Sequence, residues 1–106
     1  MGLAILGEVL SDWRRYELDD SIYVPLGVEV SNETQVHVLP FDRTRKRVFD
    51  GQQYLLGIEQ ARDVVEGLGR QLGRAATPAE RLRAVLHFVR HDAFIDPREA
   101  VGGGAI

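Results

Sequence analysis

The chain has 106 residues and a net charge of −3, with 44% hydrophobic and 27% charged side chains. This length suits one domain, and this composition is typical of a folded domain rather than of a disordered segment. The sequence contains no cysteine, which excludes disulfides, a thiolate nucleophile and thiolate metal sites.

The first predicted element is an amphipathic helix near the N-terminus. Its apolar residues recur every three or four positions, which places them on one helical face. They are Leu3, Leu6, Leu10 and Trp13. The segment meets the charged Glu8 too early for a membrane span, and its apolar stretch lacks the basic flank of a secretory leader. Together with the lack of cysteine, this predicts a cytoplasmic protein.

Three short strands are predicted next, over residues 22–24, 34–39 and 54–56. In the second of them valine alternates with polar residues, which predicts a strand with one buried face. Pro25 and Pro40 follow the first two strands and stop them, because proline cannot donate a hydrogen bond to a sheet.

A second helix is predicted over residues 58–72. Its apolar residues share one face, and they are Ile58, Ala61, Val65, Leu68 and Leu72. On the other face, Glu66 and Arg70 stand four residues apart and can form an ion pair. Gly67 and Gly69 either allow another element to approach closely or weaken the helix, and we favour a close approach.

A third helix is expected to begin after Thr77, because Thr77, Pro78 and Glu80 have the pattern of a capping box with proline at the first helical position. Its predicted core face consists of Leu82, Val85, Leu86, Val89 and Ala93. The helix is expected to end near residues 94–97. There Ala93, Phe94 and Ile95 are expected to pack into the core at the end of the helix.

In chain order these elements read α-β-β-β-α-α. They predict an α+β fold in which a small three-stranded, mostly antiparallel sheet packs against three helices. The single domain is expected to span residues 1–97. Residues 98–106, which include three consecutive glycines, are expected to form a flexible tail.

No catalytic constellation, metal site or cofactor is predicted. His87 and His91 stand four residues apart on a helix and could share a metal ion, but they lack a third ligand and a general base. The serines lie in no strand–turn–helix nucleophile motif, and the glycines form no phosphate-binding motif. We therefore expect a binding protein rather than an enzyme.

The acidic part of the chain offers the leading binding surface. Residues 1–42 hold eight acidic side chains against two basic ones, whereas the remainder has a basic excess. Asp19, Asp20, Glu29 and Glu33 lie at predicted turns and loop ends, where their carboxylates can meet a partner and steer its approach. These four residues are the predicted partner-binding site.

A basic run at residues 43–47 offers a second surface, with four cations in five residues. Such a cluster attracts phosphate. However, no aromatic residue is interleaved with the cations to stack on bases, and the acidic overall charge disfavours nucleic acid as a partner. A small regulatory or nucleic-acid-binding protein is therefore the alternative interpretation.

Three stretches together resemble a known family: residues 20–25 (DSIYVP), 54–66 (YLLGIEQARDVVE) and 91–96 (HDAFID). The pattern is similar to a family of small, acidic bacterial proteins, some of which look like immunity proteins of polymorphic or contact-dependent toxin systems. The resemblance implies a protein that binds a cognate toxin domain, for instance a nuclease, and blocks its active site or substrate access. The middle segment of that family is acidic, whereas residues 43–47 are basic here. An acidic binding surface would therefore lie between Asp19 and Glu33.

Overall fold

The computed structural model describes residues 3–101, which form one five-stranded sheet, four α-helices and a 3₁₀ helix. In chain order the elements are β1 (Leu3–Ile5), α1 (Leu6–Ser11), the 3₁₀ helix η1 (Trp13–Arg15), β2 (Ser21–Pro25), β3 (Gln35–Leu39), β4 (Val48–Phe49), β5 (Gln52–Gly57), α2 (Ile58–Leu72), α3 (Pro78–His91) and α4 (Pro97–Ala100). The predicted α+β class is confirmed, but the predicted sheet lacked two strands and the predicted helices lacked α4.

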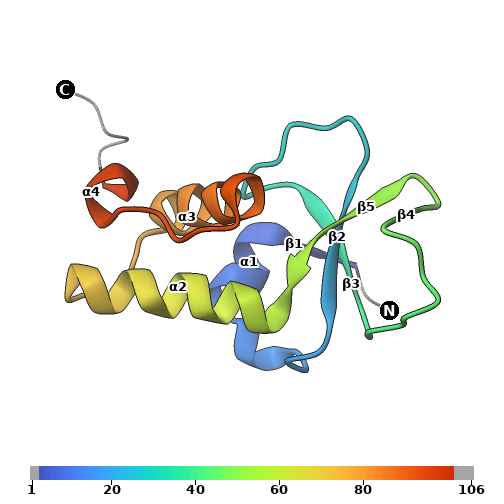
Figure 1. Cartoon of the computed structure of the whole chain (residues 1–106), viewed down its shortest axis with the longest axis horizontal. Helices are drawn as coiled ribbons and strands as arrows, with labels where there is room; N and C mark the ends of the chain where they lie inside the picture. The colour runs from blue at the N-terminus through green and yellow to red at the C-terminus, as the bar shows by residue number, and fades with distance from the viewer. Residues whose placement is uncertain (1–2, 102–106) are drawn as a thin grey trace.

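The sheet is antiparallel throughout, with the strand order β1-β3-β2-β5-β4. The helices gather on one side of it, and α2 and α3 run side by side away from the sheet (Figure 1). Ile22 and Val24 of β2 are fully buried in the core formed with these helices. Because side chains alternate along a strand, Ser21 and Tyr23 lie on the opposite face.

The N-terminal segment differs from the prediction, because residues 3–5 form a strand instead of the first helical turn. Leu3 pairs with His37 and Ile5 with Gln35, so β1 is an edge strand beside β3. Leu3 remains 56% exposed, and the helical apolar face begins only at Leu6. The expected long helix is therefore divided into β1, α1 and η1.

The second unpredicted strand, β4, pairs with β5 through a tight turn. Asp50 and Gly51 both have positive φ, 51° and 72°, which is the backbone geometry of a two-residue hairpin turn. An Asp-Gly pair is a common sequence for such a turn. The strand contains only Val48 and Phe49, too few residues for an alternation pattern to reveal it.

The helix α2 begins and ends where the sequence predicted, and Ile58, Ala61 and Leu68 are buried as expected. Glu66 pairs with Arg14 of η1, at 3.0 Å between Oε2 and Nη2, rather than with Arg70. The close approach expected at the helical glycines occurs at Gly69, where a Cβ would lie 3.2 Å from Arg74 O of the segment after α2, but it is absent at Gly67. A Cβ at Gly67 would lie 3.9 Å from its nearest neighbour, the flexible end of Arg70.

The glycines of α2 give a paired stability prediction. Gly67→Ala should raise the free energy of unfolding by about 0.5–1 kcal/mol, because alanine has the higher helix propensity and its methyl group would meet only the flexible end of Arg70, at an ordinary contact distance of 3.9 Å. Gly73→Ala should lower it by about 1 kcal/mol, because the helix ends there with a φ of +73°, which a Cβ disfavours. Urea unfolding of both variants checks the two signs, and equal signs would contradict this account.

The start of α3 is confirmed. The Thr77 hydroxyl accepts a hydrogen bond from Glu80 N at 3.2 Å, and the Glu80 carboxylate accepts one from Thr77 N at 2.8 Å. The helix ends earlier than predicted, at His91, since Asp92 turns the chain in a left-handed conformation with φ 53°. Val89, which was placed on the core face, is 39% exposed.

The segment after α3 also differs from the prediction. Phe94 is 61% exposed, whereas Ile95 is 9% exposed and enters the core in its place. The chain then forms α4, whose Ala100 is fully buried and accepts a hydrogen bond from Arg83 of α3. The folded domain therefore extends past the expected boundary at residue 97, and residues 102–106 of the expected tail lie outside the described residues. None of the helices within residues 3–101 has the length and apolar character needed to cross a membrane.

Candidate functional site

The four predicted carboxylates do not form one cluster. Asp19 and Asp20 precede β2, whereas Glu29 and Glu33 lie in the loop that follows it. The two pairs are therefore separated by the length of a five-residue strand, about 16 Å. Asp20 is partly buried, and its carbonyl oxygen accepts a hydrogen bond of 2.9 Å from Ile58 N at the start of α2. The structure thus gives Asp20 a role in joining β2 to α2.

The loop between β2 and β3 forms one side of an acidic hollow. This hollow measures 460 Å³ and is lined in part by Asn32. Its charged lining consists of three carboxylates, Glu8, Asp12 and Glu33, and two arginines, Arg15 and Arg81. Glu8 comes from α1, Asp12 is the residue directly after α1, and Glu33 comes from the loop. Glu33 is therefore the predicted residue that the fold combines with further acidic groups.

The loop is held in this place by direct contacts with two helices. Gly7 N donates a hydrogen bond of 2.9 Å to Asn32 O, and the Asn32 side-chain amide donates one of 3.2 Å to Pro78 O. A Cβ at Gly7 would lie 3.0 Å from Asn32 O, so glycine permits this close approach. The backbone of the hollow is therefore fixed from both sides.

Two polar atoms of the acidic hollow lack a partner within residues 3–101. They are Asn32 Oδ1 and Arg81 Nε, both buried at the atomic level. Arg81 is otherwise held by a hydrogen bond of 2.7 Å from Nη1 to Ala76 O. Both atoms are inaccessible to solvent and lie beneath the surface of the hollow, where a buried polar atom without a partner is unfavourable.

Sequence reasoning missed Glu8 and Asp12 as site residues. Their spacing of four residues was the available signal, because it places both on one face of a helix. Their proximity to Glu33 depends on the docking of the loop onto α1, which no local pattern reports.

A second hollow lies on the sheet face away from the helices and measures 390 Å³. We call it the basic–aromatic hollow, and its aromatic and arginine lining consists of Tyr23, Phe41, Arg43, Arg45, Arg47 and Tyr54. Tyr23 and Tyr54 are directly opposite each other in β2 and β5, with ring centroids 5.8 Å apart. Sequence analysis found no aromatic platform within the basic run, but the fold supplies one from other strands.

Arg45 fastens the loop between β3 and β4 onto this aromatic surface. Its guanidinium lies 5.7 Å from the Tyr23 ring centroid and 5.4 Å from that of Phe49. Its Nη1 donates a hydrogen bond of 2.7 Å to Pro40 O, and its side chain is only 19% exposed. Arg47 stacks in the same way on Tyr54, at 4.8 Å.

The turn within this loop is closed by a carboxylate. Asp42 accepts hydrogen bonds from the Thr44 hydroxyl at 2.7 Å and from Thr44 N at 2.9 Å. These bonds hold the pKa of Asp42 below its usual value. The Asp42 carboxylate therefore binds Thr44 within its own turn. Arg43, Lys46 and Arg47 of the same loop are exposed.

The two helical histidines are close neighbours, with ring centroids 4.6 Å apart. His87 is partly buried and His91 is exposed on the last turn of α3. Among residues 3–101, no third histidine, cysteine or carboxylate joins them in a group that could hold a metal ion.

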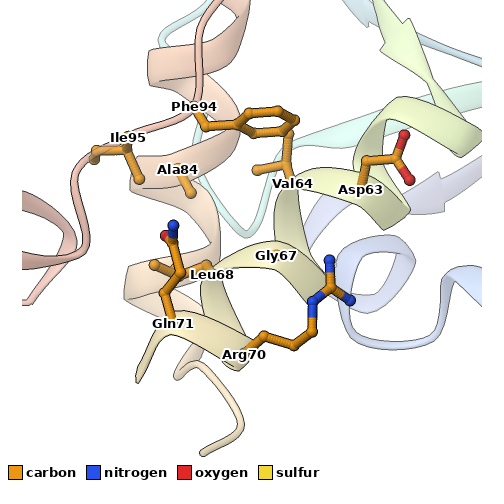
Figure 2. A pocket seen from close by; sticks show the side chains of 9 residues that line it. All are labelled: Asp63, Val64, Gly67, Leu68, Arg70, Gln71, Ala84, Phe94 and Ile95. Carbon is orange, nitrogen blue, oxygen red and sulfur yellow. The ribbon is translucent and has the colours of Figure 1, made fainter. Parts of the chain in front are cut away.

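An apolar hollow of 340 Å³ lies between α2, α3 and the segment after α3. Figure 2 shows Phe94 lying over Val64, with Leu68 and Ala84 below, and Asp63 and Arg70 at the edge. The exposed Phe94 ring is 5.7 Å from that of Phe88. This hollow is mostly apolar and lacks the converging charged groups of the other two.

Comparisons with known proteins give the family but no activity. A search of curated proteins and a search of solved structures each returned no match to this chain. A family model described as a domain of unknown function, DUF7716, matches residues 3–97, nearly all of the described domain. The chain therefore belongs to the DUF7716 family.

Proposed function

We propose that this chain is an immunity protein that binds a cognate bacterial toxin domain and blocks its active site or substrate access. The resemblance of residues 20–25, 54–66 and 91–96 to such proteins supports this proposal. These stretches lie in β2, across β5 and α2, and at the end of α3. They belong to the framework of the fold, so the contact residues must be found on the surface.

The observation that carries the proposal is the acidic hollow. Glu8, Asp12 and Glu33 converge there from two segments, and they outnumber the two arginines of the lining, Arg15, which lies 3.9 Å from Asp12, and Arg81. Lysine or arginine side chains of a basic toxin surface, such as the substrate groove of a nuclease, would pair with the carboxylates.

Charge alone would act mainly on the rate of association, because exposed carboxylates steer a basic partner toward the correct face. Tight binding also needs a desolvated centre with a few anchors in an interface of about 1,600 Å². The acidic hollow offers a volume of 460 Å³ for such an anchor side chain. Its loop is held in place by the hydrogen bond from Gly7 N to Asn32 O, so little order has to be gained on binding.

The proposal expects a toxin domain to be encoded beside this gene, and the test is co-expression of the two, followed by co-purification and calorimetry. Glu33→Lys should weaken binding on the order of 100-fold, because it places a like charge against the basic toxin surface. Asp19→Lys at the other end of β2 is the matched control and should change the affinity by less than about 5-fold. Failure of the two proteins to co-purify would disprove the proposal, and a larger loss at Asp19 would move the contact to the other end of the sheet.

A further inference from the structure

We propose that the basic–aromatic hollow is a second binding site, which takes a nucleotide unit through its phosphate and its base. The unit can be a free nucleotide or part of a single strand. This site does not depend on the proposed toxin contact, because the two hollows use loops at opposite ends of β3.

The cations of this site are placed for phosphate. The Arg47 guanidinium lies 4.8 Å from the Tyr54 ring centroid and its side chain is exposed, so its N–H groups can reach a phosphate. Arg45 lies over Tyr23, but its Nη1 donates to Pro40 O and its side chain is only 19% exposed, so Arg45 contributes charge more than free donors. Arginine binds phosphate oxygens through two parallel hydrogen bonds, and a stacked guanidinium is already oriented for this. Arg43 and Lys46 are exposed on the same loop and add positive charge.

The base would be held by the aromatic side chains. Phe41 is 62% exposed, the largest exposure among the big hydrophobic residues of the described chain, and it lines the hollow beside Tyr54. Exposed aromatic faces next to cations are the arrangement by which proteins hold single-stranded nucleic acids, since every base can stack. The volume of 390 Å³ is also within the range of small-ligand sites, roughly 300–1,000 Å³.

The acidic net charge of the chain does not oppose this site. At about 0.1 M salt, charges farther apart than roughly 10 Å are largely screened, so the nearest groups decide. The carboxylate that lines the hollow is Asp42, which is engaged by Thr44 within its own turn. Asp42 keeps its negative charge and lies 4.0 Å from Arg45, so the other three cations of residues 43–47 leave an excess of positive charge in this loop.

The test is fluorescence anisotropy of the full chain with a labelled twelve-nucleotide oligo(dT) strand at 50 mM and 200 mM salt. Three phosphate contacts predict a loss of about 10–20-fold in affinity between these salt concentrations. The double variant Arg43→Glu and Arg47→Glu should lose at least about 30-fold at low salt. Phe41→Ala should lose about 10-fold and keep the salt dependence, because it removes stacking but no charge.

The matched control is the double variant Arg70→Glu and Arg90→Glu, which reverses two exposed arginines on α2 and α3 and should change the affinity by less than about 3-fold. Competition by AMP would identify a free nucleotide as the ligand, and competition only by unlabelled strand would identify nucleic acid. No binding at 50 mM salt, an equal loss in the control, or equal competition by an oligoglutamate of the same charge would overturn the proposal. Glu33→Lys should leave this binding intact, which separates it from the toxin contact.

Discussion

Replacing Leu56 by alanine is expected to lower the free energy of unfolding by about 3 kcal/mol, within a range of roughly 2–5 kcal/mol. Leu56 is 1% exposed and pairs with the fully buried Ile22 across β2 and β5. The alanine variant loses apolar contacts and leaves a cavity between the sheet and the helices. Because domains of this size are stable by only about 5–15 kcal/mol, the loss is a large part of the total.

Leu26→Ala is the matched control for this prediction. Leu26 follows β2 directly and is 46% exposed, so the same chemical change should alter the free energy of unfolding by no more than about 0.5 kcal/mol. Urea unfolding followed by circular dichroism measures both variants. A loss below 1 kcal/mol for Leu56→Ala would contradict the placement of this residue in the core.

Glu80→Gln is expected to lower the melting temperature by about 5–10 °C at pH 7. Glu80 is 6% exposed, and its two oxygens accept hydrogen bonds of 2.8 Å each from Arg74. The same carboxylate accepts the bond from Thr77 N that caps α3. The bonds from Arg74, followed by that from Thr77, lower the pKa of Glu80 from 4.5 to about 2.

This shift fixes the pH dependence of the effect. A carboxyl with a lowered pKa in the folded state stabilises the fold above the unfolded value of 4.5, and that contribution is lost as the pH falls to about 2. The difference in melting temperature between the native chain and Glu80→Gln should therefore be constant above about pH 5 and vanish near pH 2. Glu59→Gln, whose side chain is 63% exposed, is the control and should change the melting temperature by less than about 2 °C. A difference for Glu80→Gln that persisted at pH 2 would contradict this explanation.

The parts of the fold that local chemistry determines could be predicted from the sequence. The capping box at Thr77 and the apolar spacing of α2 each depend only on residues that are close together in the chain. The sequence therefore predicted α2 and the start of α3 correctly. By contrast, β1 exists because Leu3 and Ile5 pair with β3, about thirty residues away in the chain. The apolar residues of this segment have a helical spacing, which predicted a helix. Pairing with the distant strand β3 instead makes residues 3–5 a strand.

The face of α3 shows a different reason for error. The predicted stripe continued to Val89 and Ala93, but the helix ends at His91 and the chain turns at Asp92. Within the helix, Val85 is buried as predicted, and Ala84, which was not predicted, is also buried; after the helix, Ile95 and Ala100 enter the core. A helical pattern gives the faces of a helix, but it does not report where the neighbouring helix crosses it.

The sequence predicted the charged residues of the candidate sites but not which other residues lie beside them. The sequence showed the basic run and Glu33. The other residues that line each hollow come from distant segments of the chain. Tyr23 reaches the arginines because it alternates with the core residues of β2, and Tyr54 because β5 pairs with β2. Spatial proximity of this kind follows from the register of the sheet.

The two outer strands of the sheet have a consequence for solubility at high concentration. The edge strands β1 and β4 span three and two residues, while the strands between them are five or six residues long. Unpaired backbone groups at a long, flat edge would recruit strands from other molecules, and short edges are a known protection against this. A second copy could form only a few hydrogen bonds with the described residues of β1 or β4. The sheet is thus arranged so that growth by strand addition, the first step toward aggregates, gains little free energy.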